Sequence, residues 1–183
     1  MSGSVPQGVR KDIYRILVER VKSWGKKVIL DTSGELLKEG IEAAPDMIKP
    51  NQEELSMLLG RPVTTLDDVK AAAMELYNKG IGHVVVSLGR DGALLVCDQG
   101  ILHGIPPRIK AVNTVGCGDS MVGAFAVAFR RGYGPKESLK YAVAVSAANA
   151  LSDQTGHFEP EELERIYPGV RIQDLTVSES LSD

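Results

Sequence analysis

The residues best suited to chemistry lie at the start of a predicted helix within residues 111–131. Gly116 and Gly118 precede Asp119, and an almost uninterrupted apolar run follows from Met121 to Phe129. This pattern predicts a strand or loop that turns into a buried helix. The first turn of such a helix has backbone N–H groups without partners and the positive end of the helix dipole, so it favours an anion. The two glycines leave room for a phosphate to approach that backbone closely.

Asp119 needs a role other than binding phosphate, because a carboxylate repels an anion. Near a helix N-terminus the ionised carboxylate is favoured, so Asp119 would accept a proton from a hydroxyl beside a bound phosphate. Phosphoryl transfer to an alcohol requires that combination. The alternative is an ordinary helix start, in which Asp119 or Ser120 caps the helix and the glycines form a tight turn. The local residues leave both interpretations open.

Further candidate residues follow predicted strands. Residues 27–31 form a short apolar strand that ends in the carboxylate of Asp31, and ligands of parallel α/β sheets bind at that end of a strand. The glycine-rich residues 87–92 follow another apolar strand, and a plain turn is the favoured interpretation, with a site for phosphate or ribose as the alternative. Asn51 stands where it can cap a helix, which accounts for it without a function.

The cysteines and histidines predict neither a disulfide nor a metal site. Cys97 and Cys117 stand in no metal-like or redox-like pair, so both are expected to be reduced thiols. Cys117 lies at the presumed helix start, where a lowered thiol pKa is one interpretation and a small residue tolerated in a tight turn is the favoured one. The histidines, His83, His103 and His157, lack the spacing of metal ligands.

Length and composition describe one globular domain. The chain has 183 residues, 43% of them hydrophobic, and a formal net charge of -3. No basic stretch indicates a nucleic acid or a membrane surface as a partner. No apolar run approaches the length of a membrane span, and the first residues lack the features of a signal peptide, so we expect a cytoplasmic protein.

Helical and strand patterns alternate along the chain, which favours an α/β domain with a mainly parallel sheet. Residues 1–8 are expected to form a loop, and residues 174–183 a polar, frayed tail. The common nucleotide signatures G-x-x-x-x-G-K-[ST] and G-x-G-x-x-G in a strand-to-helix setting are missing. Helices are expected in residues 9–23, 34–40, 52–59, 65–78, 134–150 and 159–167, and strands in 27–31, 47–51, 83–87, 93–97 and 101–104.

Taken together, these segments resemble the C-terminal part of the ribokinase-like (PfkB) sugar kinases, and most closely the 1-phosphofructokinase and tagatose-6-phosphate kinase branch. The resemblance extends to about Tyr167, and the Gly-x-Gly-Asp motif is its most specific marker. The markers occur in the family's order, at residues 2–6 (SGSVP), 30–34 (LDTSG), 49–55 (KPNQEEL), 87–92 (SLGRDG) and 113–120.

The resemblance implies a catalytic role for the helix start. Asp119 would be the base that deprotonates the acceptor hydroxyl, and the N–H groups of Gly116, Cys117 and Gly118 would form the anion hole for the transferring phosphoryl group. Cys117 replaces the alanine or serine that is more usual between the two glycines. That change is conservative for backbone donation but narrows the space for phosphate.

The resemblance also implies ATP and Mg2+ as cofactors. Lys49 would lie by the nucleotide phosphates, and Asn51 and Glu54, which match the family's N-x-x-E, would organise Mg2+ and phosphate. Asp31 would sit near the metal rather than act as the base, and Ser4 would touch the phosphate of the sugar. The ATP site would be lined by Ser87, Leu88, Gly89, Arg90, Asp91 and Gly92, with Val143 and Ala147 closing around adenine.

Family members also have an N-terminal half with their first strands, a lid and most sugar contacts, which these residues do not match. We therefore expect a three-layer ribokinase-like domain that lacks the N-terminal strands and the lid, with residues 1–173 as the nucleotide-binding portion and 174–183 as a tail. The expected function is ATP-dependent phosphorylation of a primary hydroxyl of a ketohexose phosphate. The alternative is a truncated, catalytically incompetent nucleotide-binding fragment. Apolar surface left uncovered by the missing half predicts homo-oligomers or other self-association.

Overall fold

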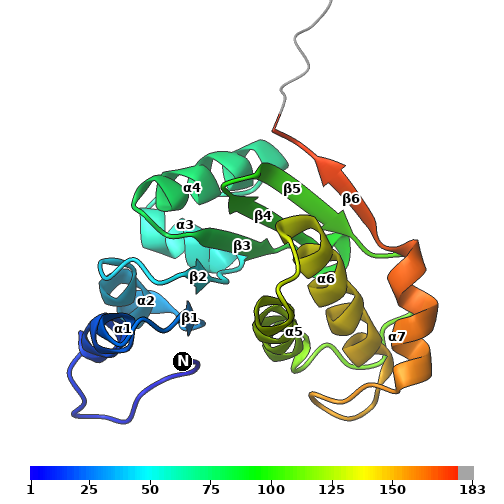
Figure 1. The fold of residues 1–183 in the computed structure, drawn as a ribbon, viewed down its shortest axis with the longest axis horizontal. Helices are drawn as coiled ribbons and strands as arrows, with labels where there is room; N and C mark the ends of the chain where they lie inside the picture. Colours follow the sequence, from blue (N-terminus) through cyan, green and yellow to red (C-terminus); the bar gives the residue numbers. More distant parts are fainter. Residues whose placement is uncertain (177–183) are drawn as a thin grey trace, which may run out of the picture. The chain divides into compact units, whose positions relative to one another are not determined.

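The computed structural model describes residues 1–176, and these divide into two compact units (Figure 1). The N-unit comprises residues 1–88 and 96–98. The C-unit comprises residues 89–95 and the described residues from 99 onward. Within residues 1–176, no helix combines the length and the apolar character needed to cross a bilayer.

Three short parallel strands organise the N-unit. They are β1 (Ile29–Leu30), β2 (Met47–Ile48) and β3 (His83–Ser87), in that order. Met47 lies opposite Ile29 on one side and His83 on the other. Because the strands are parallel, the residues that follow them lie at one edge, where ligands of such sheets bind. The predicted strands and their parallel arrangement are confirmed, although β1 and β2 are shorter than expected.

Four helices complete the N-unit. They are α1 (Ile13–Ser23), α2 (Gly34–Ile41), α3 (Gln52–Leu59) and α4 (Leu66–Asn78). Helix α4 packs on β3, and α1 packs on α2. Asn51 and Thr65 each begin their helix with a reciprocal capping box, which satisfies backbone donors that the first turn leaves free. The side chains of Val18, Leu37, Leu55 and Leu76 are buried in this unit.

The first residues of the chain differ from the prediction. Residues 1–8 were expected to form a loop, but Ser2 pairs with Asp31 in a parallel bridge next to β1. The Asp31 N–H donates to the Met1 carbonyl at 2.9 Å, and the Gly3 N–H donates to the Asp31 carbonyl at 3.0 Å. The helix expected from Val9 begins at Ile13 instead. Pairing between distant segments supplies these hydrogen bonds, and local sequence patterns do not encode it.

The strands of the C-unit are β4 (Ala93–Cys97), whose last two residues belong to the N-unit, β5 (Gly100–Ile105) and β6 (Arg171–Asp174). Strand β5 lies between β4 and β6 and pairs with β6 in antiparallel register, with Gly104 opposite Ile172. The hairpin of β4 and β5 was predicted, whereas β6 was not. Asp174, expected to open a polar tail, is the last residue of β6, and residues 177–183 lie outside the described residues.

The long helices α5 (Cys117–Arg131) and α6 (Pro135–Leu151) lie side by side in the C-unit (Figure 1). Helix α6 also contacts β5, β6 and the short helix α7 (Pro160–Ile166). A Cβ on Gly104 of β5 would lie 3.0 Å from side-chain atoms of both Leu139 and Val143, so a glycine there lets α6 pack closely on the strand. Two 3-10 turns, Gly89–Asp91 and Tyr167–Gly169, precede β4 and β6.

Candidate functional site

Gly116 sets the start of α5. It is the N-cap residue, in a left-handed conformation with a φ of 82°, and it has no side chain to cap the helix. A Cβ there would lie 2.8 Å from the Gly156 nitrogen, so both the backbone angle and the space call for glycine. The helix is therefore not capped by Asp119 or Ser120, which was the alternative interpretation of this stretch.

Asp119 lies in the first turn of α5 with its side chain exposed. Nothing within residues 1–176 offers its carboxylate a hydrogen bond or an ion pair. The next side chain behaves differently, because the Ser120 hydroxyl donates to Oδ1 of buried Asn149 at 3.2 Å. The first turn thus presents a free carboxylate to solvent beside a hydroxyl that is held by the protein.

The backbone amides of this turn divide into two groups. The Cys117 N–H donates to the Thr114 carbonyl at 3.3 Å, and the Ser120 N–H donates to the Gly116 carbonyl at 2.8 Å. In the described part of the chain, the N–H groups of Gly118 and Asp119 have no backbone acceptor. These two donors and the helix dipole make the start of α5 suited to an anion.

The carboxyl edge of the N-unit brings together Asp31 and Lys49. The Lys49 ammonium lies 3.3 Å from Oδ1 of Asp31, and only 8% of the lysine side chain is exposed. Ser4, the predicted contact for a sugar phosphate, is exposed and follows the short segment that pairs with Asp31.

Asn51 and Glu54 are also adjacent at this edge. The Glu54 N–H donates to Oδ1 of Asn51 at 2.9 Å, and the Asn51 N–H donates to Oε2 of Glu54 at 2.8 Å. Asn51 also bridges to Ser87 at the end of β3. The structure therefore brings these predicted site residues to the ends of neighbouring parallel strands, namely Asp31, Lys49, Asn51, Glu54 and Ser87. Their role in a ligand site stays a prediction.

The predicted nucleotide loop, residues 87–92, is divided between the two units after Leu88. Gly89, Arg90 and Asp91 form an exposed 3-10 turn, and the Asp91 carbonyl is bonded to the ring of His103 at 2.8 Å. Gly92 has a φ of 88°, and a Cβ there would lie 1.9 Å from the Gly104 carbonyl oxygen. Packing within the C-unit therefore accounts for this glycine.

Val143 and Ala147, predicted to close around adenine, are both buried in α6. Val143 packs next to Gly104 of β5. Their roles, like those of the other predicted site residues, stay predictions.

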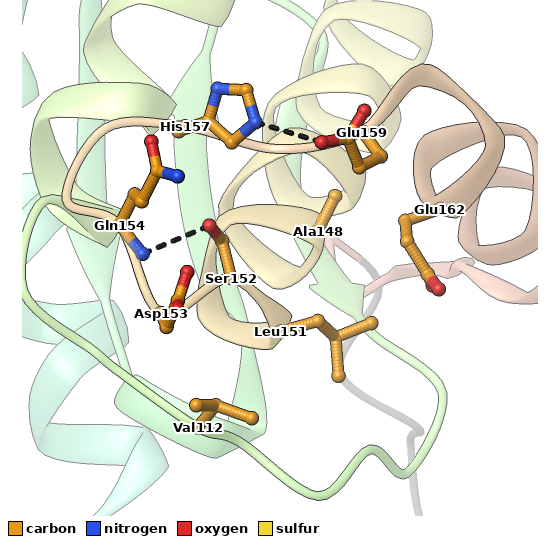
Figure 2. Close-up of a pocket in the computed structure, with 9 residues that line it drawn as sticks. All are labelled: Val112, Ala148, Leu151, Ser152, Asp153, Gln154, His157, Glu159 and Glu162. Atoms are coloured by element: carbon orange, nitrogen blue, oxygen red, sulfur yellow. Dashed lines mark hydrogen bonds and ion pairs between the residues drawn. The ribbon is translucent and has the colours of Figure 1, made fainter.

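A separate cavity of about 320 Å3 lies in the C-unit and contains none of the predicted site residues (Figure 2). The His157 ring and the Glu159 carboxylate pair across 3.0 Å at its rim. The Gln154 N–H donates to the Ser152 hydroxyl at 3.1 Å. The cavity is lined by Val112, Ala148, Leu151, Ser152, Asp153, Gln154, His157, Glu159 and Glu162.

Two residues that shape the start of α5 were missed as site candidates. Asn149 bonds to the glycine turn from α6, and Asn113 accepts the Val115 N–H at 2.9 Å and donates to the Asp153 carbonyl at 3.3 Å. The signal that would have found Asn149 is a lone amide within an apolar helical stretch, because a buried amide needs partners.

Comparison with known proteins points to one family. The model of the "pfkB family carbohydrate kinase" matches residues 1–162. The 1-phosphofructokinase of Haemophilus influenzae is 35% identical over 171 residues, which are 93% of this chain and 55% of that protein. The chain thus spans about half the length of the relatives it matches.

Solved structures agree. Phosphofructokinase-2 from Escherichia coli, crystallised in complex with potassium, matches with a TM-score of 0.87 and 37% identity, over 91% of this chain and 55% of that one. Ribokinase from Thermotoga maritima matches with a TM-score of 0.68 and 28% identity, over 81% of this chain and 51% of that one. The predicted ribokinase-like α/β fold is confirmed, and the chain belongs to the pfkB family of carbohydrate kinases.

Proposed function

We propose that this chain supplies the phosphoryl-transfer residues of an ATP-dependent kinase that acts on a primary hydroxyl of a ketohexose phosphate. The observation that carries the proposal is the start of α5, where an exposed carboxylate without partners adjoins two free backbone N–H groups. Membership of a carbohydrate kinase family and the likeness to phosphofructokinases support the same reaction class. The prediction that the N-terminal strands and the lid are lacking stays a prediction.

In this proposal Asp119 accepts the proton of the attacking hydroxyl. A base in hydrogen-bond reach of the nucleophile contributes typically about 10²–10⁴-fold to the rate. The amides of Gly116, Cys117 and Gly118 stabilise the charge on the transferring group. Like the N–H groups of Gly118 and Asp119, the Gly116 N–H has no backbone acceptor in the described part of the chain, whereas the Cys117 N–H exchanges its bond to the Thr114 carbonyl for one to the phosphoryl oxygen. The free N–H donors beside Asp119 also offset the repulsion between its carboxylate and the phosphate.

The remaining predicted residues bind the nucleotide, its metal and the sugar. Lys49 neutralises nucleotide phosphates, and Ser87 to Gly92, with Val143 and Ala147, line the ATP site. Ser4 contacts the phosphate of the sugar. The carboxylates of Glu54 and Asp31 fit Mg2+, a hard cation that takes oxygen ligands from one or two carboxylates and from substrate phosphates. When bound, Mg2+ supplies charge neutralisation on the phosphates.

The test compares the wild-type chain with Asp119→Asn in calorimetry with MgATP and in turnover assays. Fructose 1-phosphate, tagatose 6-phosphate and fructose 6-phosphate serve as acceptors. We expect Asp119→Asn to lower kcat by about a hundredfold or more while MgATP affinity changes little, because the lost group acts on the hydroxyl. Glu164→Gln, in α7 and without a predicted role, is the matched control.

Two outcomes contradict parts of the proposal. An Asp119→Asn variant that retains most of the activity excludes Asp119 as the base. A wild-type chain that binds MgATP but transfers no phosphate favours the alternative, a nucleotide-binding module without turnover. The expectation that the lid is lacking motivates that alternative, because closure of a lid sequesters the reaction from water.

A further inference from the structure

Asn149 is a fully buried amide in a helix that is otherwise apolar around it. Its exposed fraction is 0%, and its buried neighbours along α6 include Val145, Ala148 and Ala150. Burying an amide without hydrogen bonds costs a few kcal/mol, roughly 1–3 in proteins, so the side chain must have partners. A leucine would fill a similar volume without that requirement. The amide therefore has a specific use at this position.

The partners of Asn149 all belong to the start of α5. Its Nδ2 donates to the Val115 carbonyl at 3.2 Å and to the Cys117 sulfur at 3.2 Å. Its Oδ1 accepts from the Ser120 hydroxyl at 3.2 Å. The Val115 carbonyl can only accept, so the orientation of the amide follows from the chemistry of its partner. Both N–H groups and the oxygen of the Asn149 side chain therefore form hydrogen bonds with residues 115–120.

These three contacts span the glycine turn. Val115 precedes Gly116, Cys117 separates the two glycines, and Ser120 follows Asp119. Gly116 has no side chain to cap α5, so the turn depends on bonds from elsewhere. The next residue of α6 adds to them, because the Ala150 carbonyl accepts the Val112 N–H at 2.7 Å and the Asn113 N–H at 3.2 Å.

We propose that Asn149 is a positioning residue for phosphoryl transfer, which holds the glycine turn so that the free amides and the Asp119 carboxylate keep their orientation. This inference rests on the proposed function. A small displacement of such donors matters, because preorganised dipoles act only at the position where charge develops. Asn149 itself touches no reacting group, and it acts through the backbone of residues 115–120.

Amide hydrogen exchange tests the positioning without any ligand. The N–H groups of Cys117 and Ser120 are bonded within the turn, and that of Val115 is bonded to Asn113. We expect Asn149→Ala to speed their exchange by about tenfold, the equivalent of a lost hydrogen bond. The matched control is Ser138→Ala, which removes a buried hydroxyl bonded to the Tyr133 carbonyl at 3.3 Å in the same helix. The control should leave these three amides unchanged.

Calorimetry with MgATP gives the second measurement. We expect Asn149→Ala to weaken MgATP binding about tenfold and to lower kcat more than KM changes, whereas Ser138→Ala retains wild-type values at temperatures where both variants are folded. Ser120→Ala, which removes only one bond of the amide, should give a smaller effect of the same kind. It replaces Asn149→Ala as the test if that variant does not fold.

The outcomes separate the two proposals. Unchanged exchange of the three amides, or equal MgATP affinity in Asn149→Ala and Ser138→Ala, overturns the positioning role while leaving the proposed function in place. A wild-type chain without MgATP affinity overturns the proposed function, and the exchange measurement then still decides whether Asn149 holds the turn.

Discussion

Carboxylates near helix starts in this protein differ in whether they have hydrogen-bond partners. Asp68 accepts N–H groups of Thr65 and Thr64, which lowers its pKa to about 2. Asp12 is bonded to Arg10, and that bond lowers the pKa of the Asp12 carboxyl. Asp119 has no comparable partner among residues 1–176. A structural role explains Asp68 and Asp12 but leaves Asp119 unexplained, which supports a chemical role for it.

The imidazole of His83 makes the stability of the protein depend on pH. Burial in β3 lowers its pKa below the ordinary 6.5, against the opposing effects of Asp46 and Asp98. The unfolded chain therefore binds more protons than the folded one as the pH falls below 6.5, and stability falls with it until the folded imidazole titrates as well. We expect thermal unfolding at pH 5.5 to begin at a lower temperature than at pH 7.5, and His83→Gln to reduce that difference.

Asp98→Asn tests the role of His83 by strengthening the pH dependence of stability, whereas His83→Gln should weaken it. Removing the negative charge of Asp98 takes away an interaction that raises the His83 pKa. The NMR titration midpoint of the His83 ring should then move lower, and the loss of stability on acidification should become steeper. A pH dependence that persists unchanged in His83→Gln assigns it to other groups.

At the scale of elements, Gly116 at the start of α5 should be much less tolerant of substitution than Gly123 within the same helix. Gly116→Ala places a Cβ at a φ of 82° and within 2.8 Å of the Gly156 nitrogen, so we expect a loss of about 2 kcal/mol in the free energy of unfolding. Gly123→Ala is the matched control in the same helix, because a Cβ there meets no atom within 4 Å. It should stabilise the protein by up to about 1 kcal/mol. Urea unfolding measures both, and equal effects contradict the account.

Elements with local signals were predicted from the sequence. The starts of α3 and α4 were predicted from the capping residues Asn51 and Thr65, and β3, α5 and α6 were predicted from their apolar runs. The short strand β6 was missed, since its sequence Arg-Ile-Gln-Asp has mostly exposed side chains and no apolar alternation. Its pairing with β5, far away in sequence, forms the strand. The presumed start of α5 at the two glycines is confirmed, whereas the alternative, a cap formed by Asp119 or Ser120, is wrong, because Gly116 is the N-cap residue in a left-handed conformation.

At the scale of the whole molecule, the sequence predicted the family and the fold but not the contacts that hold the site. Five short motifs in the family's order were enough to predict the family, and the match over residues 1–162 confirms that prediction. The Asp31 to Lys49 pair and the contacts of Asn149 join residues distant in sequence. Such pairings depend on the packing of strands and helices, so motif spacing alone does not specify them.

Exposed apolar side chains on the described surface lead to a prediction about association. Trp24, Met57, Val112 and Val115 have exposed fractions of 62% to 75%, and the net charge of -3 gives little repulsion between copies. We expect light scattering to show a mass above that of the 19.7 kDa monomer that rises with concentration. Raising the salt concentration should not reverse it, because contacts between apolar groups are not screened.

The single tryptophan reports whether α1 takes part in this association. Trp24 follows α1, whose Ile16 and Leu17 are also partly exposed, so in the monomer its emission should be that of an indole in water and open to quenching by acrylamide. If copies meet through this helix, the emission shifts to shorter wavelength and quenching weakens as the mass rises. Association without any change in emission assigns the contact to other exposed residues, such as Met57. A mass of one chain at every concentration contradicts the prediction, because the exposed apolar side chains would then be too dispersed to drive binding.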